Sequence, residues 1–116
     1  GAVAEARAGL ARRHAELARL VDQVGLQVQE AYERAAESEA VVALYRDRVL
    51  PAAEANVKEA QTGYVTGKLP FLTLVEAQRS AVQLRERFYE AVADVARRRA
   101  ALDRAVGGPT GPPAAR

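Results

Sequence analysis

The chain has 116 residues, of which 49% are hydrophobic, 28% are charged and 5% are aromatic, and its net charge is +2. It contains no Cys, Trp or Met, and small alanines make up much of the hydrophobic class, so we expect neither a thick globular core nor disulfides nor Cys-ligated metal. Charges of both signs are mixed without a basic block interleaved with aromatics, so we expect no nucleic-acid partner.

Residues 1–62 carry the pattern of one long helix. Before the end of this stretch only Gly9, Gly25 and Pro51 interrupt it. Apolar and small residues recur at alternating steps of three and four, which marks the face that packs against a partner helix. At about 1.5 Å per residue, 60 residues would make a rod of about 90 Å. This predicted seam comprises Leu17, Val21, Val24, Val28, Ala31, Ala35, Ser38, Val42, Tyr45 and Val49.

The seam changes its spacing near Pro51. After Val49 it continues through Ala53 and Val57 in steps of four, and then through Ala60 and Tyr64. Consecutive steps of four form a stutter, which locally unwinds a supercoil. Because proline lacks an N–H and its ring clashes with the preceding turn, the helix either kinks at this point or divides in two. The periodicity resumes beyond Pro51, which favours a kink.

Residues 63–70 predict a tight reversal. We expect Gly63 to end the first helix, Gly67 to adopt a positive φ and Pro70 to stand where the next helix begins. Residues 107–116 predict a flexible tail rich in Gly and Pro.

Residues 71–106 predict a returning helix with two neighbouring apolar stripes. The main stripe is Leu74, Ala77, Ala81, Leu84, Phe88, Ala91, Val95, Leu102 and Ala105. The second stripe is Val75, Val82, Tyr89, Val92 and Val106.

The predicted fold is all-α: a long antiparallel coiled-coil hairpin with its tip at residues 63–70. The returning helix, at about 54 Å, is too short to cover more than about residues 28–62 of the first helix. Residues 2–27 therefore keep their own apolar positions uncovered, and a single antiparallel partner covers only one of the two stripes of the returning helix. We expect further helices to pack on this hairpin.

Four segments in this order resemble the TolC-type outer membrane efflux proteins. They are residues 28–32 (VQEAY), 44–53 (LYRDRVLPAA), 63–79 (GYVTGKLPFLTLVEAQR) and 101–107 (ALDRAVG), and the resemblance covers about residues 10–108. Pro51 and the Gly67-Lys68 pair are more similar to the heavy-metal and cation efflux branch of the family than to other branches.

The resemblance implies a part of a trimeric conduit in a Gram-negative outer membrane. The matching part of the family is the helix pair of the second repeat, which belongs to the periplasmic α-helical barrel. The chain would then be a fragment of the tunnel wall, packed against other protomers of a homotrimer. Its partners would be a periplasmic adaptor protein, whose helical hairpins dock at the tip, and an inner-membrane pump within a tripartite efflux system.

The resemblance also implies tip residues that dock the adaptor or gate the channel. Tyr64 matches the family's gate tyrosine, and Gly67 matches the glycine of the tip motif. Glu76 falls on one position of an acidic ring that some members carry, whereas Thr73 occupies the other position. Some members have a basic gate residue near Leu69, and here Lys68 is only adjacent to it.

Ordinary structural roles compete with these functional ones. Tyr64 could equally cap a helix end, Lys68 could simply be solvated, and Glu76 in the first turns of a helix is favoured by the helix dipole. Leu69, Phe71 and Leu72 form an apolar group at the tip, in which we expect Leu72 to close the loop and Leu69 to be available for docking.

Catalysis and metal binding have little support in the sequence. His14 is the one histidine, and no second His or Cys lies at ligand spacing from it. The chain shows no nucleophile–base pair and no phosphate-binding loop, so we expect no enzyme activity and no cofactor. It has no signal-peptide pattern and no run of about 20 apolar residues that would predict a membrane-spanning segment.

The alternative is a stand-alone coiled-coil scaffold or the helical hairpin of a periplasmic adaptor protein. Such a hairpin predicts a smooth heptad on one face of each helix. The second stripe of the returning helix favours the tunnel wall instead.

Overall fold

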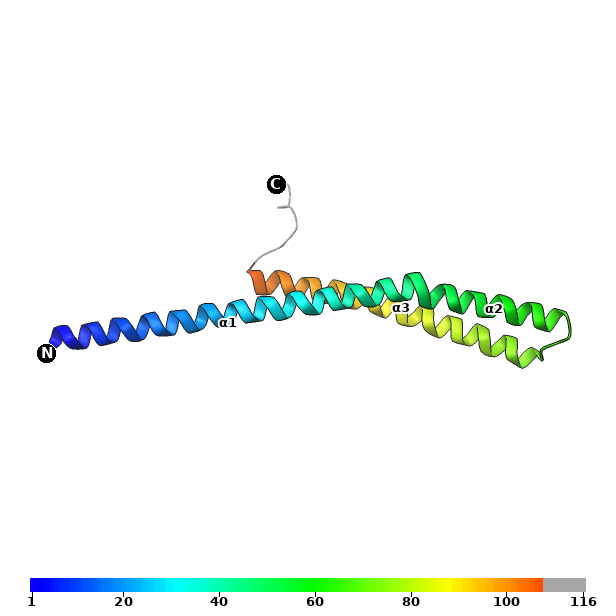
Figure 1. Cartoon of the computed structure of the whole chain (residues 1–116), viewed down its shortest axis with the longest axis horizontal. Coiled ribbons are helices and arrows are strands. Elements are labelled where there is room, and N and C mark those ends of the chain that lie inside the picture. The colour runs from blue at the N-terminus through cyan, green and yellow to red at the C-terminus, as the bar shows by residue number, and fades with distance from the viewer. Residues whose placement is uncertain (108–116) are drawn as a thin grey trace, which may run out of the picture.

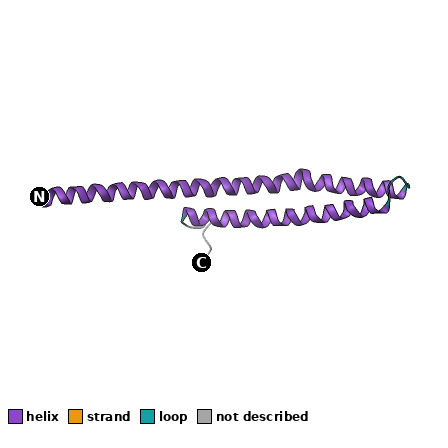
Figure 2. Ribbon diagram, turned by 90° about the horizontal axis from the view of Figure 1, so that it is seen from below, coloured by secondary structure: helices purple, strands orange, loops and turns teal. Residues whose placement is uncertain are grey.

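Two helical arms lie side by side and antiparallel, joined by one turn (Figure 1, Figure 2). The computed structural model describes residues 1–107, so the predicted tail lies outside this range except for Gly107. The first arm comprises α1 (Ala2–Leu44), the π-helical segment η1 (Tyr45–Val49) and α2 (Leu50–Val65), and the second arm is α3 (Phe71–Val106). No strand occurs within residues 1–107. The prediction of an all-α hairpin with two long helical arms is confirmed.

The hairpin is a rod. Its longest dimension is 96 Å and its radius of gyration is 26.2 Å, whereas a compact domain of 100 residues has a radius of about 13 Å. Most of the surface therefore stays in water, and the helices depend on one seam for their tertiary contacts.

The predicted seam is the contact face of the two arms from Val28 onward. The first arm contributes buried or half-buried residues at the predicted spacing, and every residue of the main stripe of α3 is buried or half-buried. The residues from the first arm are Val28, Ala31, Ala35, Ser38, Val42, Tyr45, Val49, Ala53, Val57 and Ala60. The spacing of three and four residues in the sequence thus identified the residues of the core correctly.

The core itself is thin. Its buried side chains are Leu74 and a set of small residues, and no large side chain of the described residues is fully buried. The buried hydroxyl of Ser38 donates a 2.7 Å hydrogen bond to the Ala35 carbonyl, so this polar group in the seam is satisfied. The small residues are Ala35, Ser38, Ala60, Gly63, Ala77 and Ala81. Small side chains allow the two backbones to approach closely, but they contribute little buried apolar area.

The stutter at Pro51 is accommodated by one π-helical turn. Val49 and Leu50 keep right-handed helical dihedrals, and the Leu50 N–H bonds to the Tyr45 carbonyl five residues back. The wider turn inserts one residue, which suits a seam that advances by four and which relieves the crowding of the proline ring against the preceding turn. The chain therefore stays helical through Pro51, and the axis of the first arm bends slightly there (Figure 1).

An ion pair joins the two arms away from the tip. Arg99 donates through Nη2 and Nε to Oε1 of Glu39, at 2.6 Å and 2.8 Å. Both side chains are exposed, so the pair contributes about 0.2–1 kcal/mol.

Two apolar surfaces remain uncovered, as the spacing of apolar residues in the sequence predicted. Every residue from 2 to 27 except Gly9 is exposed, and α3 ends beside Gln27, where Arg98 and Ala101 lie close to it. On α3 the second stripe is exposed at Val82, Tyr89, Val92 and Val106, whereas Val75 is half-buried. No helix of residues 2–106 combines the length and the apolar character needed to cross a membrane.

Candidate functional site at the hairpin tip

The tip is built on a helix C-terminus that ends at a left-handed glycine. Gly67 has a φ of 75°, as predicted. The Lys68 N–H bonds to the Gly63 carbonyl at 2.8 Å, and the Gly67 N–H bonds to the Tyr64 carbonyl at 3.0 Å. This is the Schellman arrangement, which satisfies the last carbonyls of a helix. The prediction that Gly63 ends the first helix is therefore wrong, because Gly67 fills that role and α2 continues to Val65.

Gly63 instead provides the space into which the loop packs. It is buried inside α2, and a Cβ built on it would lie 2.5 Å from Cδ1 and 2.7 Å from Cγ of Leu69. The Gly63 carbonyl also accepts the Leu69 N–H at 2.9 Å. Both contacts hold the loop against the end of α2. Gly63 also occupies the seam position that the spacing had assigned to Tyr64, because the step after Ala60 is three residues and not four.

The loop-closing role expected of Leu72 falls to Leu69. Leu69 closes the loop by covering Gly63, although 36% of its surface remains exposed. Leu72 is 63% exposed and closes nothing. The physical reason is that the Schellman turn aims the residues following Gly67 back at α2, whereas Leu72 lies in the first turn of α3 on the side away from the seam.

Tyr64 forms an aromatic pair with Phe71 across the turn. The ring centroids are 5.2 Å apart and the ring planes are tilted by 57°, a geometry that favours attraction between aromatic rings. Both rings remain exposed, as do Val65 and Leu72. These four residues, which we call the apolar tip, form a group of exposed apolar side chains within nine positions. Val65 was missed by the sequence reasoning because it lies off the heptad seam.

The other predicted tip residues surround this group. Lys68 is exposed in the turn, and Glu76 is exposed in the second turn of α3. Thr73 is half-buried, and its N–H bonds to the Pro70 carbonyl at 3.1 Å. The structure thus brings Tyr64, Gly67, Lys68 and Leu69 into one turn, with Thr73 and Glu76 along the start of α3. A role for these residues in docking or gating remains a prediction.

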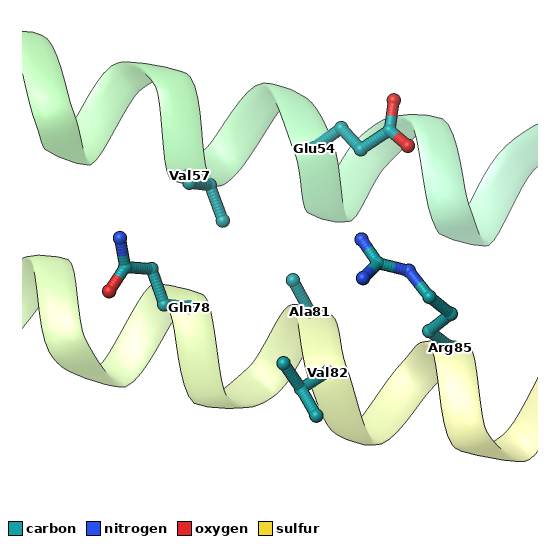
Figure 3. Close-up of a pocket in the computed structure, with 6 residues that line it drawn as sticks. All are labelled: Glu54, Val57, Gln78, Ala81, Val82 and Arg85. Carbon is teal, nitrogen blue, oxygen red and sulfur yellow. The ribbon is translucent and has the colours of Figure 1, made fainter.

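A groove of about 460 Å³ lies between α2 and α3, along the arms and set back from the tip. In Figure 3, Val57 of α2 and Ala81 of α3 point toward each other. The Arg85 guanidinium extends into the space between the two helices. The remaining lining residues are Glu54, Gln78 and Val82. The sequence analysis missed this groove, although the small Ala81 next to Val82 of the second stripe was its signal. An apolar floor with a charged rim suits the side chains of another helix.

An exposed carboxyl with a shifted pKa lies on the first arm, away from the tip. The pKa of the Asp47 carboxyl is lowered, mainly by the hydrogen bond that it accepts from Nε of Arg46. That pair is exposed and lies on η1, far along the arm from the turn. Within the described residues no three His, Asp or Glu side chains gather to hold a metal ion. The site can bind through apolar contact and surface charge.

Comparisons of the chain with protein-family models, with curated proteins and with solved structures found no match.

Proposed function

We propose that this chain is the periplasmic helical hairpin of a TolC-type outer membrane efflux channel, where it forms part of the tunnel wall and docks an adaptor protein at its tip. The observation that carries the proposal is the second stripe of α3. Val82, Tyr89 and Val92 remain exposed after the hairpin has folded, so the folded unit still has an apolar face to bury. A helical barrel wall supplies neighbours on both sides of each hairpin, and a solitary hairpin supplies none.

The tip supports the docking part of the proposal. Four apolar side chains stay in water around a turn whose backbone is fixed by the Schellman hydrogen bonds, so the surface is preorganised and costs little entropy to bind. Helical hairpins of an adaptor would present apolar side chains to the apolar tip and to the groove between α2 and α3. The chain's own role would be passive, because the energy for export would come from an inner-membrane pump.

The test uses the full-length outer membrane protein that carries this hairpin. Val65→Glu and Leu72→Glu place charges on exposed positions of the apolar tip and disturb no packed contact. We expect both to reduce chemical cross-linking to the periplasmic adaptor's hairpin, while the helical circular dichroism signal is unchanged. Leu26→Glu, which is equally exposed and lies far from the tip, is the matched control and should cross-link normally. Unchanged cross-linking and unchanged single-channel conductance in both tip variants would refute docking at the tip.

A further inference from the structure

The buried packing between the two arms is interrupted in the middle of the hairpin. In the first arm, Ser38 is the last buried residue before η1, and Ala60 is the first buried residue after it. In α3, no residue from 82 to 106 is buried. Because the arms are antiparallel and Glu54 lies across from Arg85, η1 lies against the part of α3 that follows Arg85. Neither arm contributes a buried side chain there.

The backbone of η1 is also weakly held. Its hydrogen bonds reach five residues back, as from the Leu50 N–H to the Tyr45 carbonyl, and Pro51 has no N–H to give to a carbonyl of η1. The ion pair of this segment joins the adjacent residues Arg46 and Asp47, so it does not bridge successive turns. Helices change direction at π turns and at prolines, and both occur here, where the first arm bends (Figure 1).

Each side of η1 has tertiary contacts of its own. Toward the tip, Ala60 of α2 packs with Leu74 and Ala77 of α3 in a buried cluster. Away from the tip, α1 is joined to α3 by the ion pair of Glu39 with Arg99. A segment with few buried contacts between two better-packed units is where a structure bends at the lowest cost in free energy. We call residues 52–62 with residues 71–81 the tip unit, and residues 28–43 with residues 95–105 the shaft unit.

We infer that η1 is the hinge of the hairpin, about which the tip unit bends relative to the shaft unit. α3 has no Gly or Pro between Phe71 and Val106, so it follows the motion by a gentle curvature spread over many residues. The groove of about 460 Å³ between α2 and α3 begins on the tip side of η1 and gives the arms space to change their separation. The hinge changes the direction in which the apolar tip points and leaves the packing of the turn intact. This inference goes beyond the proposed function, since it concerns the motion of the hairpin alone.

The first test is amide hydrogen exchange of the 116-residue chain, followed by NMR. In a hairpin without a hinge, opening from the two ends of the seam would make the amides of η1 the slowest to exchange, because η1 lies midway between Val28 and Gly63. With a hinge, the amides of residues 46–50 should exchange at least about tenfold faster than those of residues 36–40 and 56–60. Equal or slower exchange in η1 would overturn the inference.

The second test measures the motion itself. Residual dipolar couplings of backbone amides average over motions up to milliseconds, which includes the timescale of hinge bending. Couplings from the two units should fit two different alignment tensors, with the smaller magnitude for the tip unit, because the longer shaft dominates the alignment. A single tensor that fits both units equally well would overturn the inference.

Pro51→Ala tests the cause of the hinge, because it restores an N–H donor and removes the ring. We expect the amides of residues 46–50 to exchange at least about tenfold more slowly than in the unaltered chain, and the two tensors to converge. Pro70→Ala, which removes a proline outside the helices, is the control and should leave the exchange in η1 fast. If Pro51→Ala changed neither measurement, η1 would not be a hinge set by Pro51. No measurement involves an adaptor, so their failure would leave the docking proposal untouched.

Discussion

Replacing Gly63 with alanine tests whether the tip depends on the close contact with Leu69. In an unobstructed helix position a Gly→Ala change stabilises by about 0.5–1 kcal/mol, because the unfolded chain loses conformational freedom. At Gly63 the new methyl would lie 2.5 Å from Cδ1 and 2.7 Å from Cγ of Leu69. Overpacking of this kind costs about 1–3 kcal/mol. We therefore expect Gly63→Ala to lower the free energy of unfolding by about 1–2 kcal/mol.

The hydrogen bond of the Leu69 N–H to the Gly63 carbonyl at 2.9 Å opposes a shift of the whole residue, and rotation of the side chain would leave its Cβ 3.2 Å from the new methyl. A double-mutant cycle separates the clash from the helix propensity. In the Leu69→Ala background the contacts with Cγ and Cδ1 are removed and only the Cβ of residue 69, at 3.2 Å, still faces the new methyl. Adding Gly63→Ala should then no longer destabilise the chain and should stabilise it by up to about 0.5–1 kcal/mol, the opposite sign. Urea denaturation followed by circular dichroism at 222 nm measures both steps. Gly25→Ala, where the added methyl would meet nothing within 4 Å, is the control and should raise helicity.

The reasoning would be refuted if Gly63→Ala stabilised the unaltered chain as much as it stabilises the Leu69→Ala chain. That result would mean that the loop accepts a side chain at position 63 without strain. The packing of the seam near the tip would then not depend on the absence of a Cβ at Gly63.

Three further predictions concern the turn and the surface charges. Gly67→Ala should cost about 1–2 kcal/mol in urea denaturation, because φ is 75° and a Cβ is disfavoured in the left-handed region; a loss below 0.3 kcal/mol would contradict the Schellman geometry. Removing Glu39 and Arg99 singly and together should give a coupling energy of about 0.2–1 kcal/mol that shrinks in 1 M salt, and no coupling would mean that the pair does not form in solution. Arg46→Ala should raise the pKa of Asp47 toward its ordinary value of about 3.9, measured by carboxyl NMR titration. Because the pKa of Asp47 is lowered in the folded state, its contribution to stability is present above the ordinary pKa and is lost as the pH falls through the folded pKa. The Arg46→Ala chain should therefore lose less stability than the unaltered chain between pH 5 and pH 2.

Much of this fold follows from local sequence. The spacing of three or four residues from Val28 to Ala60 selects one helix face whatever lies opposite, and Gly67 and Pro70 leave few conformations for the turn. The greater length of the first arm follows from counting the residues on either side of that turn. These features depend on interactions within a few positions, which a single sequence specifies.

Other features were decided only when the two arms came together. The sequence predicted Gly63 as a helix end, but the approach of Leu69 makes it a packing site inside α2. The spacing placed Tyr64 in the seam, but its ring instead pairs with Phe71 from the other arm. Pro51 left a kink and a break both open, and the π-helical turn resolved them because the seam on both sides of it had to face the same partner helix.

The sequence by itself determined which faces of this chain are apolar and where it reverses, since the apolar faces depend on residue spacing along one helix and the reversal depends on Gly67 and Pro70. The tertiary structure decided how the tip is packed. The turn brings Leu69 onto Gly63 and leaves Tyr64, Val65, Phe71 and Leu72 exposed, because these contacts join residues of both arms and no local pattern specifies them.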